Sequence, residues 1–60
     1  MWYIETETGK FVVKIGDFGV GLSEDTRQAS LFKSRVEAEN WFCGTKYPSQ
    51  YKYYFRSTNS

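Results

Sequence analysis

Sixty residues with a net charge of +1 predict one small domain, and the near balance of eight basic and seven acidic side chains argues against a strongly basic nucleic-acid binder or an acidic mimic of DNA. Cys43 is the only cysteine and histidine is absent, which excludes an internal disulfide and a Cys/His metal site, so we expect no cofactor. No stretch approaches the ~18 apolar residues of a membrane span, and no signal-peptide pattern opens the chain. We therefore expect a cytoplasmic protein that makes no membrane contact.

Residues 2–6 and 11–15 alternate in polarity and are rich in β-formers, which predicts two strands joined as an antiparallel hairpin. Two registers are open. A turn with Gly9 at a positive φ pairs Thr6 with Lys10 and sets Ile4 opposite Val12. The apolar alternation instead sets Ile4 opposite Val13, and a slip of one residue exchanges the faces. We favour the second register, which keeps these apolar side chains on one face: Trp2, Ile4, Phe11, Val13 and Ile15.

Three glycines within residues 16–21 predict a bend or bulge that ends the second strand. Asp17 opens the triplet Asp-Phe-Gly, which protein kinases use to bind metal, but the other kinase motifs are missing and the chain is too short. A phosphate-binding loop is disfavoured as well, because no Gly-Lys-Ser/Thr sequence and no immediate helix follow.

Two helix starts follow this bend. Ser23 to Thr26 is typical of a cap, here for a single turn through residues 27–29. Ser34 and Glu37 form a capping-box pattern, so we expect the main helix to begin at Ser34 and to end at Gly44, with Val36, Ala38, Trp41 and Phe42 facing inward. One continuous helix over residues 24–42 is the alternative, and the cap at Ser34 favours the broken version.

Residues 51–56 alternate as a strand, with Tyr51, Tyr53 and Phe55 on one face and Lys52, Tyr54 and Arg56 on the other. The predicted fold class is therefore α+β, with the order ββαβ: an antiparallel hairpin, a short helical turn, one main helix packed on the sheet and a C-terminal third strand. We expect one compact domain over residues 1–56 and a flexible tail over residues 57–60.

Three groups of segments follow one another in a characteristic order. They are Tyr3-Ile4 with Thr8-Gly9-Lys10-Phe11, then Gly21-Leu22-Ser23-Glu24-Asp25, then Ala29-x-x-Phe32-x-Ser34-x-x-Glu37-Ala38. This order resembles that of small uncharacterised phage- and prophage-encoded proteins, and it covers roughly residues 3 to 42. The resemblance implies a compact ββα scaffold and a phage or mobile-element origin. It implies no catalytic or binding residues.

The sequence leaves three classes of function to compare. Enzyme activity is disfavoured, because histidine is absent and Cys43 adjoins an aromatic helix end, where a thiol is commonly buried and inert. Nucleic-acid binding is the alternative, since aromatic and basic side chains on residues 51–56 are typical of surfaces that stack bases. We favour a protein–protein interaction module, because twelve aromatics exceed what a small core needs, although simple core filling explains them equally well.

The candidate interaction surface combines the C-terminal strand with one helix residue. Its members are Tyr51, Lys52, Tyr53, Tyr54, Phe55, Arg56 and Trp41. The expected partner is a host protein whose activity the chain modulates or inhibits, and the same strand is a candidate for pairing with a second copy in a homodimer.

Overall fold

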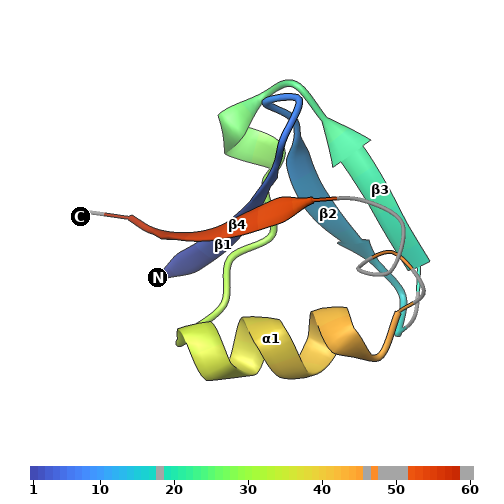
Figure 1. Cartoon of the computed structure of the whole chain (residues 1–60), viewed down its shortest axis with the longest axis vertical. Helices are drawn as coiled ribbons and strands as arrows, with labels where there is room; N and C mark the ends of the chain where they lie inside the picture. The colour runs from blue at the N-terminus through green and yellow to red at the C-terminus, as the bar shows by residue number, and fades with distance from the viewer. Residues whose placement is uncertain (18, 46, 48–51, 59–60) are drawn as a thin grey trace.

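A four-stranded antiparallel sheet with strand order β3-β2-β1-β4 organises the protein, and α1 and the short helix η1 lie at opposite ends of the molecule (Figure 1). The computed structural model describes residues 1–17, 19–45, 47 and 52–58. The elements are β1 Trp2–Thr6, β2 Phe11–Ile15, β3 Gly19–Ser23, the 3-10 helix η1 Thr26–Gln28, α1 Arg35–Cys43 and β4 Tyr53–Ser57. The α+β class is confirmed, but the sheet has four strands where the sequence predicted three.

The first hairpin follows the register that its turn dictates. Glu5 pairs with Phe11, the Thr6 amide donates to the Lys10 carbonyl at 2.7 Å, and Gly9 has φ +85°. The register that we favoured from apolar alternation is therefore wrong, because the tight turn sets the backbone pairing. As a result Ile4 and Phe11 lie on opposite faces of the sheet.

Strand β3 occupies the stretch that the sequence predicted as a bend. The chain reverses at Gly16, with φ +63°, and β3 then pairs along β2 from Ile15 opposite Gly19 to Phe11 opposite Ser23. Its glycines have low strand propensity, so the sequence did not predict a strand here. Backbone pairing with β2 holds this segment extended.

Residues 30–32 lie between the start of β1 and the end of β2. Phe32 exchanges two backbone hydrogen bonds of 2.8 Å with Trp2, while the Ser30 amide donates to the Val12 carbonyl at 3.2 Å. The Ser30 hydroxyl also accepts from the Lys14 amide at 2.7 Å. This segment thereby links the two strands of the hairpin where they separate, and it brings Phe32 into the core.

Both predicted helix starts are confirmed, and the chain does not run as one helix over residues 24–42. Asp25 caps η1 by accepting from the Arg27 amide at 2.9 Å. Ser34 caps α1 by accepting from the Glu37 amide at 3.1 Å, while the Glu37 carboxylate accepts from the amide of Lys33. In a standard capping box the glutamate accepts from the N-cap amide, whereas here Glu37 accepts from the amide one residue before the N-cap.

The inward face of α1 is set by Ala38 and Phe42, which are one turn apart and fully buried. Val36 is 64% exposed, so the prediction that it faces inward is wrong. Two residues along a helix correspond to about 200°, and Val36 and Ala38 therefore point to opposite sides. Gly44 ends the helix as predicted, although as a C-cap with φ −77° rather than in the left-handed conformation.

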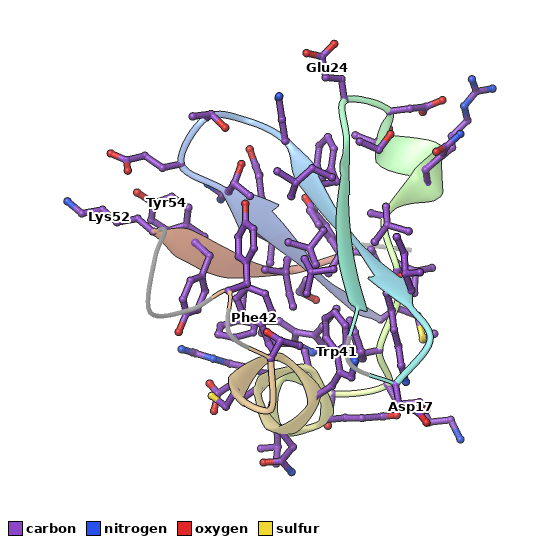
Figure 2. The ribbon with its side chains drawn as sticks, turned by 90° about the vertical axis from the view of Figure 1, so that its right-hand side faces the viewer. Asp17, Glu24, Trp41, Phe42, Lys52 and Tyr54 are labelled. Carbon is purple, nitrogen blue, oxygen red and sulfur yellow. The ribbon has the colours of Figure 1, made fainter. Side chains whose placement is uncertain are left out.

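The core lies between α1 and the sheet. Partly buried hydrophobic side chains pack around its buried members. Figure 2 shows Phe42, from the buried set, and Trp41, from the partly buried set, between helix and sheet. The buried residues are Ile4, Val12, Phe32, Ala38 and Phe42, and those packed around them are Val20, Trp41, Tyr47, Tyr53 and Phe55.

Strand β4 runs one residue beyond the predicted boundary, to Ser57, and the Thr58 amide then donates to the Met1 carbonyl at 2.8 Å. A backbone hydrogen bond therefore connects Met1 and Thr58 beside the β1–β4 pair. Of the predicted tail, residues 59–60 lie outside the described part of the chain, as do residues 48–51 of the predicted loop and strand.

Candidate protein interaction site

The candidate site is built around β4, which forms one edge of the sheet. Its only strand neighbour in the described part of the chain is β1, with Glu5 opposite Tyr54 and Tyr3 opposite Arg56. Antiparallel pairing with β1 over all five residues holds β4 extended. No other strand of the described residues pairs with the opposite edge of β4.

The direction of the β4 backbone groups follows from its neighbour. The backbone groups of Trp2 and Thr6 form hydrogen bonds on the side of β1 that faces away from β4. Because the backbone groups of successive strand residues point to alternate edges, those of Tyr3 and Glu5 point towards β4. Their partners Tyr54 and Arg56 bond back to β1, as do Lys52, whose carbonyl accepts from Glu7 at 3.2 Å, and Thr58. The residues between them must direct their amides and carbonyls to the outer edge, and these are Tyr53, Phe55 and Ser57.

The inner face of β4 belongs to the core. The ring of Phe42 meets Tyr53 at 4.7 Å between centroids and Phe55 at 6.4 Å, and both contacts are edge to face. Tyr53 and Phe55 also contact each other at 5.4 Å. For these two candidate residues the side chains serve packing, and the alternation predicted for the strand is correct over its described part.

The outer face of β4 is polar and accessible. Tyr54 is 48% exposed, and the Arg56 guanidinium carbon lies 5.6 Å from the centre of its ring. Arg56 also forms an ion pair with Glu5 at 2.7 Å across the strand pair. Figure 2 shows Lys52 and Tyr54 directed outward, away from the core. The remaining predicted strand residue, Tyr51, lies outside the described residues.

A groove of about 580 Å³ lies between α1 and β4. Its helix wall consists of Arg35, Glu39 and Cys43, which are spaced by four residues and therefore share one face of α1. Arg35 pairs with Glu39 at 2.9 Å, and its guanidinium carbon lies 5.5 Å from the ring centre of Phe55. We call this feature the β4 groove; its strand wall consists of Tyr53, Tyr54 and Phe55.

The sequence did not predict the helix wall: Arg35 and Glu39 were expected only to face outward, and Cys43 was not expected to lie beside them. Their i, i+4, i+8 spacing was visible, but no local pattern showed that β4 would pair with β1 and so lie beside this face. Cys43 is exposed, whereas the sequence suggested a buried thiol at the aromatic helix end.

Trp41 does not line the β4 groove. It stacks on Phe32 and Phe42 at 5.5 and 5.9 Å, and the Lys14 ammonium lies 5.9 Å from its ring centre. Its indole nitrogen is buried without a hydrogen-bond partner among the described residues. The structure thus separates Trp41 from the other candidate residues and places it at the core boundary.

Two further findings concern the described residues as a set. They contain no group of three or more His, Cys, Asp and Glu side chains that could hold a metal ion. Nor do they contain a helix of the length and apolar character needed to span a bilayer.

Comparison with known proteins gives no relative from which a role could be transferred. No protein-family model matches the chain, and neither the curated proteins nor the solved structures contain a significant match.

Proposed function

We propose that this protein is a non-enzymatic interaction module that binds a partner protein by adding a strand of the partner to β4. The observation that supports the proposal is the outer edge of β4, which no other described strand covers and where Tyr53, Phe55 and Ser57 direct backbone groups outward beside the β4 groove. An added strand gains affinity from main-chain hydrogen bonds, whereas its side chains meet the walls of the groove and provide specificity.

The two faces of such a strand meet different chemistry. Side chains directed to the helix side contact Arg35, Glu39 and Cys43, and side chains on the other side contact Tyr54 and Arg56. The helix wall offers one positive and one negative group, so a polar partner residue of either sign finds a counter-charge. Tyr and Arg on the other side are residue types that commonly anchor interfaces.

The setting proposed for this activity comes from the resemblance to phage-encoded proteins. In it the partner is a bacterial host protein, and binding modulates or inhibits that protein. Base stacking by the C-terminal strand has less support, because Tyr53 and Phe55 pack on Phe42 and Arg56 is paired with Glu5.

The test is capture of a partner from bacterial lysate by the tagged protein, with and without nuclease and at two salt concentrations. We expect a stoichiometric host protein that survives nuclease and is lost from Glu39→Lys, since this change reverses one charge of the groove wall. Glu24→Lys is the matched control, because Glu24 is exposed and lies at the far end of the molecule (Figure 2).

Hydrogen exchange on the complex then locates the contact. Strand addition protects the amides of Tyr53, Phe55 and Ser57, while the amides that bond to β1 change little. Equal capture by both charge variants, or protection confined to other strands, would rule out the β4 groove as the binding site. Recovery of nucleic acid alone, released by high salt, would support the alternative function instead.

A further inference from the structure

We infer that β4 also pairs with β4 of a second copy, antiparallel and with Phe55 on the two-fold axis, forming a dimer that covers the β4 groove. The dimer itself stands on the geometry of β4; its regulatory meaning rests on the proposed function. An edge strand in a two-fold arrangement presents the same backbone groups to its copy, so the pairing is self-complementary and closed.

The two-fold axis is limited by which β4 residues direct their backbone groups outward. Because Tyr53, Phe55 and Ser57 direct their groups outward, an axis at Phe55 pairs Phe55 with its copy and Tyr53 with Ser57 of the second copy. All three outward residues of β4 then take part in hydrogen-bonded pairs. Shifting the axis by one residue in either direction leaves one end of the strand without such a pair within Tyr53–Ser57.

Charge selects the same register. With the axis at Phe55, Tyr54 lies opposite Arg56 of the second copy in a pair whose side chains approach closely. This extends a contact that already exists within one chain, where Arg56 lies 5.6 Å from the Tyr54 ring centre. The pairing occurs twice in the dimer, once on each side of the axis.

The neighbouring registers bring like charges together. An axis at Tyr54 sets Arg56 opposite Lys52 of the second copy, and an axis at Arg56 sets two Arg56 side chains opposite each other. Like charges directly opposite on a sheet are destabilising. The helix walls add no such repulsion, because each contains one Arg35–Glu39 pair with no net charge.

The consequence is competition. The dimer uses the backbone edge that the partner strand would use, and it brings two β4 grooves face to face. The protein therefore holds its binding edge closed at high concentration and opens it on dilution or when a partner displaces the second copy. Its affinity for a partner should fall as its own concentration rises.

Disulfide trapping distinguishes the three registers. In a Cys43→Ser background we would prepare Tyr54→Cys with a tag and Arg56→Cys without one, and oxidise each alone and the two mixed. Directly opposite residues of this type have Cα atoms about 4.5 Å apart, within disulfide range, whereas diagonal neighbours at about 7–8 Å are too distant.

We expect rapid crosslinking in the mixture and little in either variant alone. Crosslinking of Tyr54→Cys with itself would show the axis at Tyr54, and crosslinking of Arg56→Cys with itself would show the axis at Arg56. Either result overturns the inferred register. The mixed dimer retains one Tyr54–Arg56 contact, so the substitutions do not remove the whole interaction.

Sedimentation without added cysteines provides the second readout. Wild type should pass from monomer to dimer as its concentration rises, and Ser57→Pro should remain monomeric because it removes an outward amide. Ser57→Ala retains that amide and should dimerise like wild type. A wild-type protein that is monomeric throughout overturns the inference, and because no partner is present this result leaves the proposed function untouched.

Discussion

Tyr53 meets Phe42 edge to face, with ring centroids 4.7 Å apart and planes at 85°. This contact joins the C-terminal strand to Phe42, a fully buried residue of α1, and Phe55 makes a second contact of the same kind with Phe42. Two of the aromatics that suggested an interface thus hold the sheet to the helix. What β4 offers a partner is its outer backbone edge, with Tyr54 and Arg56 beside it.

Adjacent tyrosines in β4 should therefore respond differently to truncation. Tyr53→Ala should lower the free energy of unfolding by about 2 kcal/mol, since a half-buried ring loses its contacts with Phe42 and Phe55. Tyr54→Ala should change it by less than about 0.5 kcal/mol, as exposed positions usually do. Urea unfolding at low protein concentration measures both without a contribution from dimerisation.

The same pair of variants separates packing from interaction. Tyr54→Ala should weaken dimerisation and partner capture despite its unchanged stability, because its ring lies on the accessible face. Similar destabilisation at both positions would show that β4 has no aromatic side chain available to a partner.

The N-cap of α1 should contribute measurably to stability, because the helix has only nine residues. Ser34→Ala leaves the Glu37 amide without its acceptor at 3.1 Å, and we expect a loss of about 1 kcal/mol in unfolding free energy. Ser57→Ala removes a hydroxyl on an exposed strand residue and is the matched control, with little change expected. Equal effects in thermal unfolding would contradict the role of Ser34 as a cap.

Two glycines of β3 should tolerate alanine to different degrees. A Cβ at Gly19 would collide with the backbone carbonyl oxygen of Ile15, which cannot move without disturbing the second hairpin. At Gly21 the nearest atom, at 2.7 Å, is the tip of the Ile15 side chain, which is 58% exposed and can rotate away. Gly19→Ala should therefore lower the melting temperature clearly more than Gly21→Ala; the reverse order would place the close approach elsewhere.

Acid should weaken the turn at η1 through Asp25. The Arg27 side chain, and then the Arg27 amide, hydrogen-bond its carboxylate and hold the pKa below the ordinary value of 3.8. A lowered folded-state pKa stabilises the fold above the unfolded pKa, and this contribution disappears as the pH falls through the folded pKa.

Wild type should accordingly lose slightly more unfolding free energy between pH 5 and pH 2 than Asp25→Asn, which keeps an acceptor oxygen but does not titrate. Urea unfolding across this range, with NMR titration of the Asp25 carboxyl, provides the measurement. Parallel pH profiles for the two proteins would show that the Arg27 contacts do not favour the ionised form.

The sequence predicted local structure correctly wherever a few neighbouring residues decide it. Ser34, and the stretch from Ser23 to Thr26 that contains Asp25, indicated the two helix starts. The side-chain oxygens of Ser34 and Asp25 accept from amides three and two residues ahead. Gly9 indicated the hairpin turn, and alternation in residues 53–56 indicated which β4 side chains share a face. Each of these features depends on contacts within one turn or one strand, so the sequence by itself determined them.

Only the tertiary structure decided the remaining features, because they depend on segments far apart in the chain. Apolar alternation favoured the wrong hairpin register, since it showed neither the backbone pairing of Thr6 with Lys10 nor the contact of Tyr3 with Phe11 on the other face of the sheet. The glycine-rich β3 became a strand only by pairing with β2. The β4 groove likewise exists because pairing of β4 with β1 sets the strand beside the Arg35–Glu39 face of α1, and no local propensity encodes that neighbour.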